Sequence, residues 1–432
     1  MRTRSLLGAM AVVGLVSSAC SSAATPSPAP ATPAPATASA PASASAAASP
    51  SASPSPAGPS LPTSIGAGEG ELDIIIWAGY AEDGTNQKAY DWVKPFEAAT
   101  GCKVKTKEGN SSDEMVTLMR QGGGTVWDGV SASGDASNRL IANGDVAPIN
   151  VDLIPDYKNI APFLQSPPHN TVNGVHYGIS HGWGGNSLMY RTDLFTPAPT
   201  SWASVFDTTQ AAAYKGKITD YDSPIYIADA ALYLKANKPE LAITDPYELT
   251  QPQFDAAVQL LKDQQPFVGK YWVSYTDQID NFTNGTTTIG TTWPYQVNTL
   301  KGQTPPVKVD QVVPSEGMTG WADTWMMSSH AKHPNCMYKW MAWMVTPGVQ
   351  AQVAESFGES PANPQACDLL DKAGGVGPYA LANFCTAYHV TDKSYYDAIS
   401  FWKTPQADCG DSRGQTCIDY SVWTQKWTEI KG

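Results

Sequence analysis

The sequence of 432 residues lacks the short motifs of the common hydrolases and nucleotide-binding enzymes. It contains no G-x-S-x-G nucleophile elbow, no H-E-x-x-H zinc motif, no P-loop and no G-x-G-x-x-G after a predicted strand. It also contains no C-x-x-C, which removes the simplest thiol-redox and zinc-ribbon interpretations. These absences favour a binding protein without metal or cofactor over an enzyme, and leave a secreted hydrolase as a distant alternative.

Charge is absent from residues 21–68, which consist almost entirely of Ala, Pro, Ser and Thr. Such a segment cannot bury a core, so we expect a disordered linker. Residues 1–19 run from charged to apolar to small, the order of a secretory signal, and their apolar run is too short to span a bilayer. The boundary Ser-Ala-Cys resembles the lipobox of bacterial lipoproteins, in which Cys20 becomes the lipidated first residue. We therefore expect export and a lipid anchor on the outer face of the cytoplasmic membrane, or otherwise a periplasmic or secreted protein.

Basic residues are few, since 27 Lys and Arg face 40 Asp and Glu. Removing Arg2 and Arg4 with the signal leaves 25 basic residues and a net charge of about −15. This balance argues against nucleic acid and anionic lipid surfaces as partners. It only weakly favours a cationic ligand, because many secreted proteins are acidic for solubility alone.

Cysteine is also scarce, but besides Cys20 the remaining six form an even number in a chain that we expect to be exported. We expect three disulfides, and other connectivities remain open. The favoured pairs are Cys409 with Cys417, which close a short polar loop, then Cys367 with Cys385 and, by elimination, Cys102 with Cys336.

The chain beyond the linker is too long for one typical core, so we expect two domains. Residues 71–77 have a continuous apolar centre, which suits a strand covered on both faces. Helical spacing follows over 89–96, where Pro95 predicts a kink or an early break. Residues 102–107 alternate as a second strand, and 111–114 have the pattern of a capping box. Strand and helix in alternation predict β-α-β units and an α/β lobe.

Tryptophans fall at the ends of predicted strands. Trp77 ends the first apolar strand, Trp293 ends a later one and Trp321 opens another. Ligands of open parallel sheets bind beyond the carboxyl ends of strands, so these rings are candidates for lining a cleft. Asp323 is two residues from Trp321 on an extended chain, so both side chains point to the same side. Trp325 shares their parity but lies further into the strand, so we expect it in the core.

The order and spacing of several segments resemble the solute-binding lipoproteins of bacterial ABC importers, specifically the spermidine- and putrescine-binding branch. The resemblance covers residues 72 to about 403. The matching segments are "IIIWAGY" (74–80), "SSDEM" (111–115), "WDGVSASGD" (127–135), "HYGISHGWG" (176–184), "TSWASVFD" (200–207), "YKGKITDYDS" (214–223), "FTNGTTTIGTTW" (282–293), "PSEGMTGWADTWMMSSHA" (314–331) and "TPGVQAQVAESFGESPAN" (346–363).

The resemblance implies an α/β fold of the type II periplasmic-binding-protein kind, with two lobes joined by crossover strands and a ligand cleft between them. It also implies a membrane permease as partner and a monomeric state. The crossings are expected near 178–183 and 314–321. The expected parts are a first lobe in 69–180 and 317–360, a second lobe in 181–316, and a disulfide-containing C-terminal segment in 361–432 that packs on the lobes.

The family's binding residues can be carried over at six positions. In this family, aromatic faces hold the methylenes of the ligand and attract its ammonium groups, and carboxylates pair with those groups once water is expelled. The matches are Trp77 and Tyr80 as the first aromatic pair, Ser133 on the next loop of the same lobe, Trp293 as the stacking tryptophan of the second lobe, and Trp321 with Asp323 as the aromatic and acid that grip one amine.

The sequence departs from the family where acids are usual, near Gly79 and near Pro224. Neither place holds an acid here. Asp222 or Asp220 is the candidate substitute for the second, by a small shift along the chain.

Three further departures bear on the ligand. Asp135 and Glu359 are near positions where the family often has aromatics, and we count both as candidate ligand-binding residues. Lys403 falls near a neutral amide, and a lysine in the cleft would repel a polyamine and attract a carboxylate. The rearranged charges predict a small cationic solute, polyamine-like, with a zwitterionic amino acid or opine-like compound as the alternative.

Two other ligand classes remain open on the same fold. Sugar binders also stack rings on tryptophan and use Asp to bind hydroxyls. A metal binder would draw on imidazoles, but His176 and His181 lie five apart in a predicted crossover strand and do not have the spacing of a ligand pair on a helix. The available ones are His169, His176, His181, His330 and His333.

Overall fold

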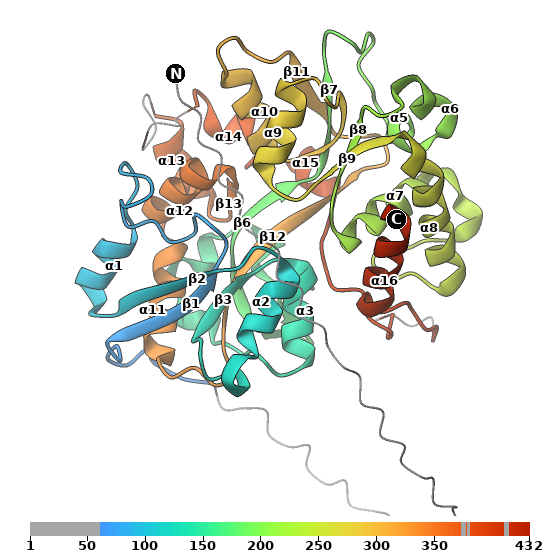
Figure 1. Ribbon diagram of the computed structural model, residues 1–432. Coiled ribbons are helices and arrows are strands. Elements are labelled where there is room, and N and C mark those ends of the chain that lie inside the picture. Colours follow the sequence, from blue (N-terminus) through green and yellow to red (C-terminus); the bar gives the residue numbers. More distant parts are fainter. Residues whose placement is uncertain (1–60, 373–376, 378–380, 410–413) are drawn as a thin grey trace, which may run out of the picture. The chain divides into compact units, whose positions relative to one another are not determined.

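The computed structural model describes residues 61–372, 377, 381–409 and 414–432 (Figure 1). The predicted signal peptide, Cys20 and most of the predicted linker lie outside the described residues. Among the residues that are described, no helix combines the length and the apolar character needed to cross a bilayer.

The first of two large sheets has seven strands and is of mixed direction. β1 pairs in parallel with β2 and β3, while β12 runs antiparallel to both β3 and β6. In spatial order the strands are β13 (Ser360–Pro361), β6 (Gly178–Gly185), β12 (Met318–Met327), β3 (Gly129–Ala132), β1 (Glu71–Ile76) and β2 (Lys103–Glu108), and β14 (Ile399–Phe401) pairs with β12. The apolar run of β1 is almost completely buried, as expected for a strand covered on both faces.

The second sheet has five strands, and a separate hairpin joins β4 (Thr171–Val172) to β5 (Val175–His176). β8, β9 and β10 supply its parallel pairs, and β7 runs antiparallel to its two neighbours. In spatial order the strands are β11 (Val309–Val312), β7 (Ser187–Arg191), β10 (Ile289–Thr292), β8 (Ile218–Tyr221) and β9 (Val268–Trp272).

Helices accompany both sheets, so the chain is of the α/β class (Figure 1). Those inserted between β7 and β11 are α5 (Ala203–Phe206), α6 (Thr208–Ala211), α7 (Ile227–Asn237), α8 (Gln251–Gln264), α9 (Tyr275–Thr283) and α10 (Pro294–Gly302). The others are α1 (Val93–Thr100), α2 (Ser112–Met119), α3 (Gly134–Ala142), α4 (Pro162–Gln165), α11 (Pro334–Met344), α12 (Pro347–Val353), α13 (Cys367–Leu370), α14 (Phe384–Ala387), α15 (Lys393–Asp397) and α16 (Tyr420–Lys431).

Two segments carry the chain from one sheet to the other. β6 leads into β7 with Asn186 alone between them, and β11 leads into β12 through residues 313–317. Figure 1 shows β6 and β12 side by side, in agreement with their antiparallel pairing. The α/β fold with two lobes and crossover strands, expected from the sequence, is therefore confirmed. β6 belongs to the first sheet and extends to Gly185. The expected lobe boundary between 180 and 181 therefore falls inside this strand.

Local sequence explains where the first helices begin and end. α1 begins at Val93, later than the apolar spacing predicted, and this places Pro95 in the first turn, where its missing N–H leaves no bond unmade. Gly101 ends the helix with a φ of 74°, a left-handed conformation that glycine adopts without strain. At α2, the hydroxyl of Ser111 accepts from the N–H of Glu114 as predicted, but the Glu114 carboxylate accepts from Asn110.

The three disulfides are the pairs favoured from the sequence. Cys367 pairs with Cys385 and Cys409 with Cys417, across 18 and 8 residues. Cys102 pairs with Cys336 across 234 residues, so this bond ties α11 to the start of β2 although the whole second sheet lies between them in the chain. A crosslink over so long a loop strongly restricts the unfolded chain.

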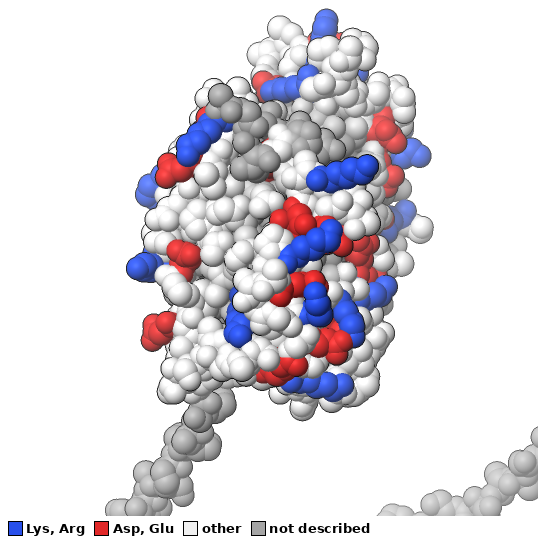
Figure 2. Space-filling model, turned by 90° about the vertical axis from the view of Figure 1, so that its left-hand side faces the viewer, with Lys and Arg blue, Asp and Glu red and all other residues white. Residues whose placement is uncertain are grey.

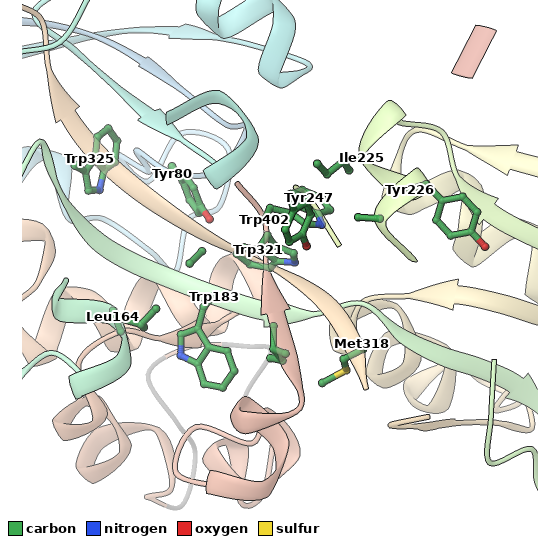
Figure 3. Close-up of a cluster of buried hydrophobic side chains, with 14 of the residues drawn as sticks. Tyr80, Leu164, Trp183, Ile225, Tyr226, Tyr247, Met318, Trp321, Trp325 and Trp402 are labelled. Carbon is green, nitrogen blue, oxygen red and sulfur yellow. The ribbon is translucent and has the colours of Figure 1, made fainter. Parts of the chain in front are cut away.

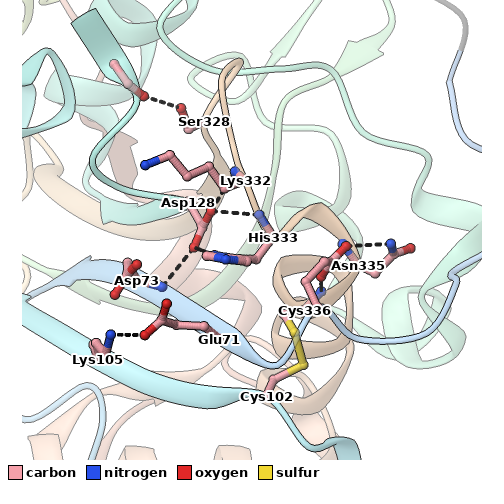
Figure 4. Close-up of polar contacts among 12 residues, drawn as sticks. Glu71, Asp73, Cys102, Lys105, Asp128, Ser328, Lys332, His333, Asn335 and Cys336 are labelled. Atoms are coloured by element: carbon pink, nitrogen blue, oxygen red, sulfur yellow. Dashed lines mark hydrogen bonds and ion pairs between the residues drawn. A yellow bond between two sulfur atoms is a disulfide. The ribbon is translucent and has the colours of Figure 1, made fainter. Parts of the chain in front are cut away.

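The amino-terminal edge of the first sheet is held by Asp128 (Figure 4). Its Oδ1 accepts from the N–H groups of Lys332 and His333, and its Oδ2 accepts from Asp73 N–H and lies 2.7 Å from His333 Nδ1. Asp73, Asp128 and His333 are close enough to resemble a metal site. Because four protein groups already satisfy Asp128, the cluster is explained as a clamp between β1, β3 and the loop before α11.

Charged side chains of both signs are interspersed on the face that Figure 2 shows, which lies on the left in Figure 1. The ion pairs Lys103 with Glu97 and Lys94 with Asp91 belong to this part of the first lobe. This face has no continuous basic surface of the kind that binds nucleic acid.

Candidate ligand-binding site

A cavity of about 300 Å³, here called the central pocket, lies between the two sheets. The carboxyl ends of parallel strands supply much of its wall: Trp77 follows β1, Ser133 follows β3 and Trp293 follows β10. This is the edge at which open α/β sheets bind ligands. Of the residues predicted to bind ligand, those that line the central pocket are Trp77, Ser133, Trp293, Trp321 and Asp323.

The strand β12 carries pocket residues first and a core residue further along, as predicted from the position of Trp325 deeper in the strand. Trp321 and Asp323 face the central pocket and are 6% and 3% exposed. Trp325 is fully buried and packs edge-on against Trp340, with ring centroids 5.5 Å apart. In Figure 3, Trp321 lies near Trp402 in the middle of the view. Trp325 lies further along β12, near Tyr80.

The carboxylate of Asp323 is held by two hydroxyl groups. Ser133 donates to Oδ1, and Tyr80 lies 2.7 Å from Oδ2. Burial raises the pKa of Asp323 to about 6, and these hydrogen bonds keep it from rising further. Among the described residues, no Lys or Arg forms an ion pair with Asp323. At neutral pH the central pocket therefore contains a buried carboxylate without a countercharge.

Tyr80 joins Asp323 to a second acid behind the pocket wall. Its hydroxyl oxygen lies 2.6 Å from Glu359 Oε2 as well as 2.7 Å from Asp323 Oδ2. One hydroxyl hydrogen cannot serve both carboxylates, so one acid must carry a proton of its own. Burial raises the pKa of Glu359 well above its usual value, and we assign the proton to it. Glu359 then donates to Tyr80, Tyr80 donates to Asp323, and the network carries one negative charge.

The neighbouring histidine does not change this charge. His181 is fully buried, and burial lowers its pKa to about 3, so the ring is neutral at pH 7. Its Nε2 lies 3.0 Å from Ser131 Oγ, while its Nδ1 is 3.9 Å from Glu359, beyond hydrogen-bond distance. Neither Glu359 nor Tyr80 is among the residues that line the central pocket.

The second sheet contributes an aromatic wall. Trp293 packs edge-on against Trp272, with centroids 4.9 Å apart, and its Nε1 donates to Asn186 at the crossover. Tyr221 stacks on Trp402, with their ring planes 12° apart. These contacts fix the orientation of the rings before any ligand enters, which lowers the entropy cost of binding.

Two predicted acids are not among the residues that line the central pocket. Asp135 is buried at the start of α3, where Ser112 donates to its Oδ1. Asp222 accepts from Trp427 Nε1 at 2.8 Å and pairs with Lys431, both on α16. The geometry therefore gives neither acid a direct route to a ligand in this pocket.

Lys403 is also engaged elsewhere. Its ammonium lies 2.8 Å from Asp245 and pairs with Glu248 in the second lobe. Burial alone would lower the pKa of Lys403, but these two carboxylates raise it, so the side chain is charged and paired. It is not among the residues that line the central pocket.

Several pocket residues were not predicted. Tyr221 is the last residue of β8 and Trp293 directly follows β10, so the rule that identified Trp293 applies equally to Tyr221. Phe357 comes from the π-helical turn Ala354–Gly358, and Trp402 follows β14 near the end of the chain. No pattern in the sequence places Trp402 near the strands that meet at the pocket.

A larger hollow of about 770 Å³ lies between α2, α3 and the start of α16. Its two arginines are already paired, Arg120 with Asp145 and Arg139 with Asp113. Volume alone therefore does not identify the binding site, and we place it at the central pocket, where a buried charge has no partner.

Comparison with known proteins shows the family to which the chain belongs. Residues 91–373 match the family model for bacterial extracellular solute-binding protein. The spermidine/putrescine-binding periplasmic protein of Escherichia coli (strain K12) is 24% identical over 310 residues, 70% of this chain and 84% of that protein. The solved structure of the spermidine/putrescine ABC transporter substrate-binding protein PotD from Streptococcus pneumoniae is similar with a TM-score of 0.61 at 19% identity, over 83% of this chain and 97% of that one. MotA from A. tumefaciens B6 in complex with glucopine is similar with a TM-score of 0.60 at 15% identity, over 84% of this chain and 100% of that one.

Proposed function

Because the chain belongs to the bacterial extracellular solute-binding protein family, we propose that it captures a small organic cation between its two lobes and delivers it to the permease of an ABC importer. Asp323 carries the proposal, since it is a buried carboxylate without a countercharge in a pocket walled by aromatic rings. An ammonium group satisfies both features, because it pairs with the carboxylate and is attracted to the ring faces.

The relatives support a nitrogen-containing ligand. The Escherichia coli relative is a spermidine/putrescine-binding protein, and another from Pseudomonas aeruginosa is a putrescine/agmatine-binding protein. We assign direct ligand contacts to Trp77, Ser133, Trp293, Trp321 and Asp323. Tyr80 and Glu359 act behind them by holding the charge of Asp323 in place.

A zwitterionic ligand is the second candidate, and one observation favours it. Within the described part of the chain, the indole N–H groups of Trp77, Trp321 and Trp402 have no hydrogen-bond partner, although all three residues line the central pocket. A ligand carboxylate could accept from them while its ammonium pairs with Asp323. MotA, in its complex with glucopine, is a structural neighbour with an opine ligand.

Capture requires the lobes to open and close. We propose that they pivot at Asn186 and at residues 313–317, the two places where the chain passes between the sheets. The moving parts would be residues 69–180 with 317–360 against 181–316, with 361–432 packed on them. We further propose that the protein is a monomer held at the outer face of the membrane by a lipid on Cys20 and the linker 21–68.

Calorimetry or thermal-shift screening of the purified protein tests the ligand class. The compounds are polyamines, amino acids, quaternary amines and oligosaccharides, and we expect stabilisation by amines. Stabilisation by a neutral sugar but by no amine would overturn the cationic proposal. Stabilisation by amino acids or opines, with no response to simple amines, would select the zwitterionic candidate instead.

A further inference from the structure

Trp293 differs from the other tryptophans of the central pocket in its hydrogen bonding. Its Nε1 donates to Asn186 Oδ1 at 2.9 Å. Within the described part of the chain, the indole N–H groups of Trp77, Trp321 and Trp402 have no such partner. Asn186 alone joins β6 to β7, so the partner of the Trp293 ring lies at one of the two segments that pass between the sheets.

Further hydrogen bonds continue from Asn186 to a buried acid. Its Nδ2 donates to Thr319 Oγ1 at 2.7 Å, and Thr319 Oγ1 donates to Asp229 Oδ1 at 2.9 Å. Thr319 is on β12, just after the second crossover, and Asp229 is on α7 of the second lobe. The backbone N–H of Asn186 also donates to Thr319 O at 2.8 Å. These four residues, Trp293, Asn186, Thr319 and Asp229, are here called the crossover network.

The tryptophan ring fixes the direction of every bond in the crossover network. An indole N–H can only donate, so the side-chain oxygen of Asn186 must face Trp293 and its amide nitrogen must face Thr319. The hydroxyl of Thr319 accepts from that nitrogen and keeps its hydrogen for Asp229, whose Oδ1 must accept. Because one arrangement of donors and acceptors satisfies all the bonds, the loss of one member disturbs the others.

The members behind the ring are buried, so water does not readily replace a lost partner. Asn186 is 7% exposed, Thr319 0% and Asp229 2%. Burial raises the pKa of Asp229 to about 8, the hydrogen bond from Thr319 opposes the rise, and the nearby charge of Asp220 adds to it. At pH 7 Asp229 is therefore largely protonated, and an asparagine in its place would offer the same acceptor oxygen.

We propose that the crossover network positions the ring of Trp293 for the ligand and ties its orientation to the two segments that connect the lobes. This inference rests on the proposed function, in which Trp293 contacts the ligand. Asn186, Thr319 and Asp229 are positioning residues, since none of them is among the residues that line the central pocket. A ring that is held in place before binding loses less entropy when the ligand arrives.

The substitution Thr319→Val removes the central hydroxyl and nearly keeps the shape of the side chain. Asn186 then lacks the acceptor for its Nδ2, and its amide can turn until this nitrogen faces the indole N–H, donor against donor. The packing of Trp293 against Trp272 remains. The ring is then held by packing without its hydrogen bond, and ligand binding has to order it.

Isothermal titration calorimetry on the full-length chain tests the crossover network, with spermidine as the probe. Thr319→Val should weaken binding by about 3- to 10-fold, the net value of one hydrogen bond expressed as affinity. Asp229→Asn keeps an acceptor oxygen and should leave binding within about twofold. Thr219→Val is the matched control. Thr219 is also a fully buried threonine, its hydroxyl donates to Gln278, and it is not among the residues that line the central pocket.

A double-mutant cycle separates positioning of the ring from a general loss of packing. Trp293→Phe keeps an aromatic ring but has no N–H, so the network no longer reaches the ring. In that background Thr319→Val should change spermidine affinity by less than about twofold. In protein with isotope-labelled tryptophan, the indole N–H resonance of Trp293 is identified by its absence from Trp293→Phe. Without any ligand, this resonance should shift in Thr319→Val and stay in place in Thr219→Val.

The outcomes separate this proposal from the proposed function. If spermidine binds but Thr319→Val leaves its affinity within about twofold and the resonance in place, the positioning role alone is overturned. If Thr319→Val weakens binding equally with Trp293 and with Trp293→Phe, or if Thr219→Val weakens it as much, the effect is a general loss of packing and the proposal fails. If no amine binds the unmodified protein, the proposed function falls and the positioning role falls with it.

Discussion

The two sheets contribute different chemical groups to the walls of the central pocket. The wall from the first sheet, here called the polar wall, contains a carboxylate beside its aromatic rings, since Ser133 and Tyr80 hold Asp323 near Trp77 and Trp321. The wall from the second sheet is aromatic, with Tyr221 and Trp293 at the ends of two strands. The acid next to Tyr221 in the chain, Asp222, is neutralised by Lys431 and is not among the residues lining the pocket.

We propose that charge recognition and covering of the ligand are assigned to different lobes. A buried carboxylate attracts a cation before the cleft closes, and the aromatic wall excludes water when it does. With the ligand charge paired in one lobe, the other lobe can move without breaking an ion pair. Four measurements test this difference between the two walls.

The largest effect is expected on the polar wall. Asp323→Ala should weaken a cationic ligand by about 2 to 5 kcal/mol, because the ammonium is then buried without its partner. Calorimetry with an amine ligand measures this loss of binding free energy. Unchanged affinity would place Asp323 outside the binding site and remove the basis of the comparison.

The charge of Asp323 should also make the stability of the ligand-free protein depend on pH. The pKa of Asp323 in the folded protein, about 6, is above its value in the unfolded chain, so the folded protein binds this proton more tightly. The cost of the buried carboxylate is present above pH 6 and disappears as the pH falls toward 4. The free energy of unfolding of Asp323→Asn, relative to the unmodified protein, should therefore fall by about 2 kcal/mol between pH 7 and pH 4. Denaturant titrations at both pH values check this, and a constant difference would show that Asp323 does not titrate in this range.

A smaller effect is expected on the aromatic wall. Trp293→Ala should weaken a cationic ligand by about 1 to 2 kcal/mol, because it removes a ring face that attracts the cation. Trp293→Phe keeps an aromatic ring and should lose less than half as much binding free energy as Trp293→Ala. Equal losses in the two variants, measured by calorimetry, would mean that packing around Trp272 matters rather than the ring face presented to the ligand.

The smallest effect is expected at Asp222. Asp222→Asn should change ligand affinity by less than about 0.5 kcal/mol, since its carboxylate is bound to α16. It should lower the free energy of unfolding by up to about 1 kcal/mol, the value of a partly exposed ion pair. A loss of affinity comparable to that of Asp323→Ala would show that both lobes contribute charge.

Family membership and fold could be predicted from the sequence because they depend on residue patterns within short segments and on the spacing of those segments. The apolar run at the start of β1, the glycine that ends α1 and the spacing of the matching segments are all readable along the chain. The family predicted from the resemblance is confirmed, and with it a binding protein rather than an enzyme. The side of β12 on which Trp321 and Asp323 lie follows from strand alternation alone.

The strands, the aromatic positions at their ends and the acid on β12 follow from the order of residues in the chain. Which acids are available to a ligand depends on the fold, because the partner of an acid comes from distant segments. Lys431 pairs with Asp222 across 209 residues, and Glu359 reaches Tyr80 across 279. The position of a carboxylate in the folded protein, rather than the number of acids in the sequence, therefore decides whether it can pair with a ligand.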